Sequence, residues 1–132
     1  MTDISTLLFV LFAIGVAVFF AATAFGFGAA SPDDEVLERA TELLTTEEAR
    51  LIDVRTPREF SNNGLEGADN IPLQELSSRL DEVGPKDEPV VLYCRSGNRS
   101  AQALDLLEQN GFEQVYDLGA HRSAKRVVDE AR

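Results

Sequence analysis

One run of residues limits what the rest of this chain can fold into. Residues 4–30 form an apolar stretch without a single charged side chain. As a helix the stretch would span about 40 Å, whereas the hydrocarbon core of a bilayer is about 30 Å thick. The sequence therefore predicts one N-terminal transmembrane helix within residues 1–30. A globular core has to come from residues 31–132, a length typical of one small domain.

The flanks of the apolar run leave two interpretations open. A secretory signal begins with basic residues and has a shorter apolar core of about 7 to 15 residues, but residues 1–5 contain no Lys or Arg. Small residues at 28–30 would permit cleavage before Ser31, giving a periplasmic or secreted protein. Lys and Arg occur only after the run. This asymmetry favours a single-pass membrane protein whose C-terminal domain lies in the cytoplasm.

Charge and cysteine content exclude several classes of partner and site. Asp3 is the only charged residue before Ser31, so residues 31–132 carry 22 acidic and 12 basic side chains. Such an acidic domain is poorly suited to nucleic acid phosphates. The chain has one cysteine, Cys94, which excludes an intramolecular disulfide and any multi-cysteine metal site. We expect no metal and no cofactor.

Short strands and helices alternate through residues 31–132. Apolar and β-branched runs predict strands at 50–54, 67–72, 90–93 and 115–118. Caps and helical spacing predict helices from Ser31, after the Thr56–Glu59 capping box, from Leu73 to Gly84, and over 101–111 and 124–131. This alternation predicts an α/β fold with a small central parallel β-sheet flanked by helices on both faces.

Cys94 directly follows the most apolar of these strands. Ligands of parallel sheets bind beyond the carboxyl ends of the strands. The segment 94–99 leads into a helix, whose free N–H groups, together with Arg95 and Arg99, favour an anion. Gly97 would let the loop curl its amides toward one centre. The pattern predicts a thiolate whose pKa lies below the usual value of about 8.5. The alternative is an inert, packed cysteine between solvated arginines.

Three segments resemble the rhodanese-like sulfurtransferase family: LIDVRTPREF at 51–60, GADNIPL at 67–73 and VVLYCRSGNRSA at 90–101. With the Gly-Phe to Leu-Gly segment at 111–119, they cover nearly all of the chain after residue 30, in the family's order. The resemblance implies a rhodanese-like domain at 31–132. It also implies sulfur transfer through a persulfide on Cys94, from a small anionic donor such as thiosulfate. The acceptor would be cyanide or a thiol, which a protein could carry.

By matching position, the resemblance implies that Cys94 is catalytic and that a substrate-binding loop follows it, formed by Arg95, Ser96, Gly97, Asn98 and Arg99. The two arginines would hold the donor. Family relatives that act as phosphatases or arsenate reductases have five residues between cysteine and arginine, but here there are four. The shorter loop favours sulfur transfer over those two activities. A non-enzymatic sulfur carrier or docking module with the same fold stays open.

Other polar residues near these motifs have simpler explanations. We expect Asp53 and Arg55 to fix the strand-to-helix turn, Glu59 to cap a helix, and His121 to be a solvated loop residue more than a base. The sequence also departs from the family pattern, because Gly119-Ala120-His121-Arg122 replaces a glycine pair followed by tryptophan. We expect that change to affect the shape of the pocket wall and the substrate preference more than the fold. A small basic cluster follows it: Arg122, Lys125 and Arg126.

Overall fold

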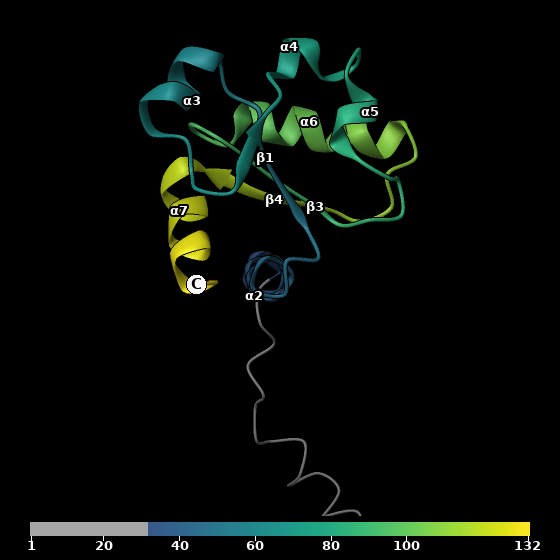
Figure 1. The fold of residues 1–132 in the computed structure, drawn as a ribbon. Helices are drawn as coiled ribbons and strands as arrows, with labels where there is room; N and C mark the ends of the chain where they lie inside the picture. Colours follow the sequence, from purple (N-terminus) through teal and green to yellow (C-terminus); the bar gives the residue numbers. More distant parts are fainter. Residues whose placement is uncertain (1–31) are drawn as a thin grey trace, which may run out of the picture. The chain divides into compact units, whose positions relative to one another are not determined.

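The structure is a computed structural model that describes residues 32–132 (Figure 1). The predicted transmembrane segment, residues 4–30, and the predicted cap Ser31 lie outside the described residues. Within 32–132, no helix has the length and apolar character that crossing a bilayer requires. The membrane-spanning segment therefore stays a prediction from the sequence.

Helices and strands alternate along the described residues as the sequence predicts. Their order is α2 (Pro32–Thr45), β1 (Arg50–Asp53), α3 (Pro57–Asn63), β2 (Ala68–Asn70), α4 (Leu73–Leu76), α5 (Leu80–Val83), β3 (Val90–Cys94), α6 (Asn98–Gln109), β4 (Val115–Ala120) and α7 (His121–Glu130). The capping box at α3 is present in full, because the Glu59 N–H donates to Thr56 Oγ1 and the Thr56 N–H donates to the Glu59 carboxylate.

The four strands form one parallel sheet in the order β2-β1-β3-β4. Every residue of β3 is buried, as expected of a strand that lies between two others and is covered on both faces. Parallel pairing brings the carboxyl ends of β1, β3 and β4 to the same edge of the sheet. We call this edge the carboxyl edge, and Cys94 ends β3 there. The predicted central parallel sheet is confirmed.

Helices cover both faces of the sheet (Figure 1). One core cluster joins β-sheet residues to α4, α5 and α6, and includes Ile52, Leu92 and Leu107. The other joins the opposite face to α2 and α7, and includes Val91 and Val127. Successive β3 residues alternate between the two clusters, which is the side-chain alternation of a strand. The predicted two-sided α/β architecture is confirmed.

The prediction of a single helix from Leu73 to Gly84 is wrong. The segment instead forms two short helices, α4 and α5, separated at residues 77–79. There the Ser78 hydroxyl donates to the Glu75 carbonyl oxygen at 2.8 Å, and the Ser78 N–H bonds to the same oxygen. Serine side chains compete for backbone groups in this way and favour turns over helix interiors.

Two helices begin earlier than the sequence predicts, and both shifts affect the carboxyl edge. Helix α6 begins at Asn98 rather than near Ala101, and α7 begins at His121 rather than at Ala124. The free N–H groups of α6 therefore follow Cys94 almost immediately. His121 is the first residue of a helix, so the prediction of a loop histidine is wrong.

Candidate active site

Cys94 is the last residue of β3, and its side chain is fully buried. It belongs to the core cluster that faces α6. The residues after it, 95–97, cross from the strand to the first turn of α6. A buried sulfur at this point lies between the carboxyl end of a central strand and the amino end of a helix, as the sequence predicts.

The Cys94 loop, residues 94–99, turns a backbone amide toward the sulfur. The Gly97 N–H donates a hydrogen bond to Cys94 Sγ at 3.0 Å. Gly97 has a φ of 97°, in the left-handed region that residues with a side chain rarely adopt. The prediction that Gly97 lets the loop curl around the sulfur is confirmed by this geometry.

Ser100 is a second polar neighbour of the sulfur, and the sequence reasoning missed its role. Its Oγ accepts a hydrogen bond from the Cys94 thiol at 3.5 Å and donates to the Gly97 carbonyl oxygen at 3.1 Å. The residue is fully buried on the first turn of α6. One sequence signal was available, a serine three residues after the loop glycine. In a helix that starts at Asn98, this third residue faces back toward Cys94.

These contacts change the pKa of the Cys94 thiol. Burial by itself raises the pKa, because it penalises the charged thiolate. The hydrogen bond with the Ser100 hydroxyl and the bonds from the backbone N–H groups of Ser100, Gly97 and Ser96 act in the opposite direction. Together they outweigh burial, so the pKa is lowered. The loop therefore favours an anionic sulfur inside the domain.

Arg99 does not stand free beside the sulfur. Its guanidinium donates to Glu59 through two bonds, Nη1 to Oε2 at 2.8 Å and Nη2 to Oε1 at 2.9 Å. The bonds from Arg99 hold the pKa of the Glu59 carboxyl well below its usual range, since they stabilise the carboxylate against the effect of its partial burial. Glu59 is thus more than the predicted cap, because it also anchors the end of the Cys94 loop to α3.

The remaining predicted loop residues are exposed. The side chain of Arg95 extends into solvent, and its backbone oxygen accepts a bond from the His121 N–H at 3.4 Å. Ser96 pairs with Ala120 through an isolated antiparallel bridge. Asn98 accepts a bond from Gln102 through Oδ1 at 2.7 Å. The loop is therefore closed on one side by the end of β4.

An irregularity in β4 makes this closure possible. Leu92 pairs with Asp117 and Cys94 with Ala120, so β4 carries one more residue than β3 between these pairs. Gly119 lies in this bulge with a φ of 69°, and its N–H donates to Asp117 Oδ1 at 2.7 Å. A Cβ atom on Gly97 would lie 3.5 Å from Gly119 Cα. The two glycines thus bring the loop and β4 into backbone contact.

A polar network lies behind the site on the other face of the sheet. Arg55 and Asp53 form a buried ion pair, with Nη2 to Oδ2 at 2.7 Å and Nε to Oδ1 at 3.0 Å. Arg55 also donates to Asn63 Oδ1 at 2.8 Å, and its guanidinium lies 5.6 Å from the ring centre of Tyr93. The predicted role of Asp53 and Arg55 in fixing the strand-to-helix turn is confirmed.

His121 belongs to the same supporting network. Its Nε2 lies 2.8 Å from the Asn63 carbonyl oxygen, and its ring meets the Tyr93 ring edge-on at 5.9 Å. These contacts tie the start of α7 to the end of α3. His121 therefore supports the carboxyl edge from behind rather than joining the hydrogen bonds at Cys94 Sγ.

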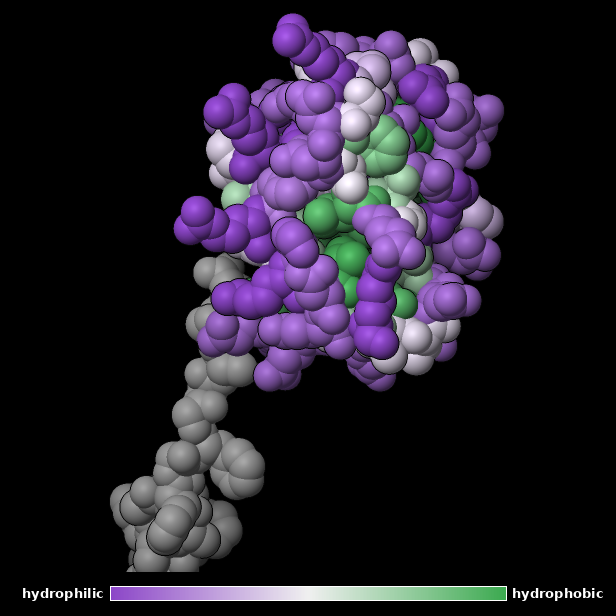
Figure 2. All heavy atoms as spheres, turned by 60° about the vertical axis from the view of Figure 1, so that its left-hand side comes forward, coloured by the Kyte–Doolittle hydropathy of each residue, from purple (hydrophilic) through white to green (hydrophobic). Residues whose placement is uncertain are grey.

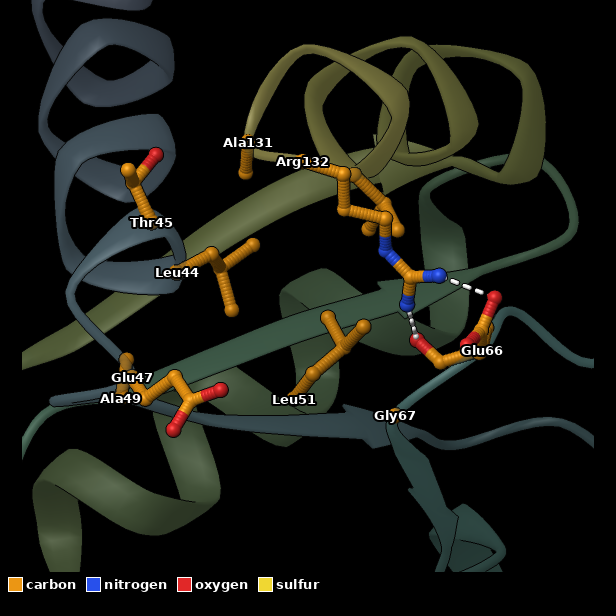
Figure 3. Close-up of a pocket in the computed structure, with 10 residues that line it drawn as sticks. Leu44, Thr45, Glu47, Ala49, Leu51, Glu66, Gly67, Ala131 and Arg132 are labelled. Carbon is orange, nitrogen blue, oxygen red and sulfur yellow. Dashed lines mark hydrogen bonds and ion pairs between the residues drawn. The ribbon is translucent and has the colours of Figure 1, made fainter.

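A hollow of about 630 Å³ lies far from the Cys94 loop (Figure 3). It is bordered by the end of α2, the start of β1 and the residues after α7, with Leu44, Leu51 and Ala131 among its lining. Arg132 crosses one side and pairs with Glu66. Since the lining residues Ala49 and Gly67 directly precede β1 and β2, this hollow opens at the amino edge of the sheet, opposite Cys94. Within residues 32–132, no group of His, Cys, Asp and Glu is arranged to hold a metal ion.

Comparison with known proteins agrees with this geometry. The family model of the rhodanese-like domain matches residues 36–120. A protein from Allochromatium vinosum named "Sulfurtransferase" is 41% identical over 86 residues, which are 65% of this chain and 78% of that protein. "Thiosulfate sulfurtransferase PspE" of Escherichia coli is 38% identical over 69 residues, covering 52% of this chain and 66% of that protein.

Solved structures agree as well. "Human Single Domain Sulfurtranferase TSTD1" superposes with a TM-score of 0.60 at 29% identity, over 68% of this chain and 92% of that one. The structure described as "rhodanese with anions from E. coli" gives 0.54 at 34% identity, over 57% of this chain and 89% of that one. The match to the family model extends over more than half of the chain and includes the whole Cys94 loop. The chain therefore belongs to the rhodanese-like domain family.

Proposed function

We propose that this protein is a sulfurtransferase that carries a sulfane sulfur as a persulfide on Cys94. The observation that carries the proposal is the pair of polar groups at the buried sulfur, the Gly97 N–H at 3.0 Å and the Ser100 hydroxyl at 3.5 Å. These groups favour a thiolate, which is the form of cysteine that attacks sulfur. Relatives named as sulfurtransferases support the same chemistry.

In the loading step the Cys94 thiolate attacks the outer sulfur of a donor such as thiosulfate. A sulfur–sulfur bond forms to Cys94, and the sulfur–sulfur bond of thiosulfate breaks. Sulfite leaves with the electron pair, so no other oxidant or reductant is needed. The persulfide anion takes over the hydrogen bonds of the loop amides at Ser96 and Gly97 and of the Ser100 hydroxyl.

In the discharge step an acceptor, cyanide or a thiolate, attacks the outer sulfur of the persulfide. The bond to Cys94 breaks and its electron pair restores the Cys94 thiolate. The product is thiocyanate or an acceptor persulfide. Overall the sulfane sulfur moves from donor to acceptor, and the enzyme returns to its starting state.

The two loop arginines have different roles in this proposal. Arg95 is exposed and has no ion-pair partner among the described residues, so it is free to meet the sulfonate end of the donor. Arg99 is held by Glu59 and keeps the loop in shape while adding positive charge near the sulfur. Ser96, Gly97 and Asn98 supply the short backbone turn that surrounds the donor.

Intact-mass measurement tests the proposal directly. The protein is incubated with thiosulfate under non-reducing conditions, and sulfite release is measured in parallel. We expect a gain of one sulfur atom and a matching amount of sulfite, both absent in Cys94→Ser. Failure to gain sulfur from thiosulfate or from polysulfide would refute the persulfide.

A non-enzymatic sulfur carrier with the same fold is the alternative. "Putative sulfur carrier protein YrkF" of Bacillus subtilis is 32% identical over 72 residues, and its name supports this second candidate. A carrier would load stoichiometrically without turning over, whereas we expect many cycles with thiosulfate and cyanide. A phosphatase or arsenate reductase would act on aryl phosphate or arsenate, and we expect neither reaction.

We also propose that residues 4–30 anchor the protein in a membrane with the domain on the cytoplasmic side. The support is the charge-free apolar run and the absence of Lys and Arg before it. Labelling of Ser77→Cys, an exposed position, in a Cys94→Ser background would report the side of the domain in intact cells. Protection from a membrane-impermeant reagent is expected. Labelling in intact cells, or recovery of the protein without the membrane fraction, would contradict this placement.

A further inference from the structure

We propose that the carboxyl edge around Cys94 docks the sulfur acceptor as a thiol on an acidic protein surface. The inference rests on the proposed sulfur transfer and adds the kind of partner that receives the sulfur. The inference is drawn from the arginines that make no ion pair. These arginines are concentrated on one edge of an otherwise acidic domain.

Most basic side chains of residues 32–132 are neutralised within the domain. Seven of the twelve form ion pairs, at Arg39, Arg50, Arg55, Arg79, Arg99, Lys125 and Arg132. Five others have no ion-pair partner in this part of the chain, and all five are exposed: Arg58, Lys86, Arg95, Arg122 and Arg126. Since acidic residues are in large excess, unpaired arginines are the exception that calls for an explanation.

Three of these five side chains lie at the carboxyl edge, and a fourth lies one helical turn beyond it. Arg95 follows Cys94, Arg58 lies in the first turn of α3 beyond β1, and Arg122 lies in the first turn of α7 beyond β4. Arg126 is one turn further along the same face of α7. Lys86 alone lies at the opposite edge, in the segment before β3. We call Arg58, Arg95, Arg122 and Arg126 the arginine group.

Nearby carboxylates do not cancel this charge. Asp53 and Glu59 lie at the same edge, but Arg55 and Arg99 already neutralise them. Asp117 lies in β4 before the bulge and accepts a bond from the Gly119 N–H. The carboxyl edge therefore carries an excess of positive charge, while the domain as a whole is strongly negative.

The spread of the arginine group favours a protein over a small anion. Thiosulfate bound at Cys94 has one charged end, which Arg95 on the loop is placed to meet. Arg58 and the two α7 arginines come from separate helices outside the Cys94 loop. Figure 2, in which the side that bears α3 and α7 comes forward, shows a mostly hydrophilic surface with apolar side chains gathered near its centre. The positive charge of the arginine group is spread over three elements, and such a spread suits electrostatic steering of an oppositely charged surface.

The acidic remainder of the domain strengthens this orientation. An acidic partner is repelled from the other faces and attracted only where the arginine group lies, which is also where Cys94 lies. Attraction at one face and repulsion elsewhere give specificity of orientation. The acceptor thiolate then attacks the outer sulfur of the Cys94 persulfide, and the Cys94 thiolate leaves.

The test uses persulfide-loaded protein and three short peptides that each carry one cysteine between acidic, neutral or basic residues. Discharge is followed by intact mass, and rates are compared per thiolate because flanking charges alter the thiol pKa. We expect the acidic peptide to discharge the persulfide about tenfold faster than the neutral one at low salt. The difference should largely vanish at about 0.5 M salt, because screening shortens the range of the attraction.

Two charge reversals separate the arginine group from net charge. Arg122→Glu and Lys86→Glu change the net charge equally, but only the first alters the carboxyl edge. We expect Arg122→Glu to lose most of the preference for the acidic peptide and Lys86→Glu to retain it. Both variants should discharge to dithiothreitol at the wild-type rate.

The outcomes distinguish this inference from the function on which it rests. Equal rates for acidic and neutral peptides with loaded wild-type protein would overturn the docking surface and leave sulfur transfer intact. An equal loss in Lys86→Glu and Arg122→Glu would overturn it as well, since net charge alone would then explain the preference. Failure to load sulfur would overturn both proposals.

Discussion

Arg99 and Glu59, 40 positions apart in the sequence, form a two-bond ion pair that joins the first turn of α6 to the first turn of α3. About a quarter of each side chain is exposed. Glu59 also accepts bonds from the N–H and hydroxyl of Thr56. One carboxylate thus holds the start of α3 and the end of the Cys94 loop together.

Glu59→Gln should reduce stability in a pH-dependent way. In the folded protein the pKa of Glu59 is depressed below its usual value of 4.5, so the ion pair stabilises the fold above that pH. The stabilisation is lost as pH falls through and below about 4.5, because the unfolded chain then binds a proton more readily. We expect a loss of about 1 kcal/mol at neutral pH.

Urea unfolding of wild type and Glu59→Gln across pH 3 to 7 would measure this difference. The gap between the two proteins should shrink toward the acid end. Glu75→Gln is a useful control, since Glu75 pairs with Arg79 at a more exposed site. A gap that stays constant with pH would rule out the ion pair as its source.

Ser100→Ala should raise the pKa of Cys94 and slow sulfur loading. The hydrogen bond between this hydroxyl and Cys94 Sγ is one of the contacts that lower the pKa of the thiol, and removing it leaves the effect of burial less opposed. A hydrogen bond to a charged group contributes about 1.5 to 3 kcal/mol, so loading by thiosulfate should fall about tenfold or more. The rate of Cys94 alkylation against pH gives the pKa. An unchanged titration would remove Ser100 from the anion site.

Gly97→Ala and Gly119→Ala should have separable effects. Both positions have positive φ, so each substitution is expected to destabilise the fold by about 1 kcal/mol. A Cβ on Gly119 meets nothing within 4 Å, whereas Gly97 donates its N–H to Cys94 Sγ. We therefore expect Gly97→Ala to raise the pKa of Cys94 and Gly119→Ala to leave it unchanged. Alkylation and urea unfolding of both variants would check this, and equal pKa shifts would contradict it.

Asp53→Asn should destabilise the domain by about 3 kcal/mol, because it leaves the Arg55 guanidinium buried without its counter-charge. Asp53→Leu combined with Arg55→Met should recover part of that loss, since no unpaired charge remains. Urea unfolding of the three proteins measures both effects. A double variant that is less stable than Asp53→Asn would show that the pair stabilises the fold by more than neutralising its two charges.

Local sequence patterns were sufficient to predict much of the fold. The continuous apolar run at 90–93 identifies the central strand, which the structure extends by one residue to Cys94, and the Thr56–Glu59 spacing identifies the start of α3. Both the strand and the helix start are determined by residues that are close together in the sequence. They place Cys94 at the end of a parallel strand and before a helix, which is where the structure has it.

Contacts between distant residues could not be predicted in the same way. The capping box with Thr56 already explained why a glutamate occurs at position 59. Nothing in the local sequence therefore indicated that Glu59 also pairs with Arg99. His121 meets Tyr93 and Asn63 only because α7 begins three residues earlier than its apolar spacing indicates. The break between α4 and α5 depends on a serine hydroxyl that binds backbone, and a helical spacing of leucines does not report it.

The contact between Gly97 and Gly119 allows the choice of acceptor to change independently of the sulfur chemistry at Cys94. The atoms nearest to a Cβ on Gly97 would all be backbone atoms of Gly119 and Ala120, so the loop and β4 meet here through backbone. Replacements on the outer face of α7 can then alter which acceptor is favoured without disturbing the atoms around Cys94 Sγ. A lineage with this arrangement could acquire new acceptors through α7 while its sulfur chemistry stayed constant.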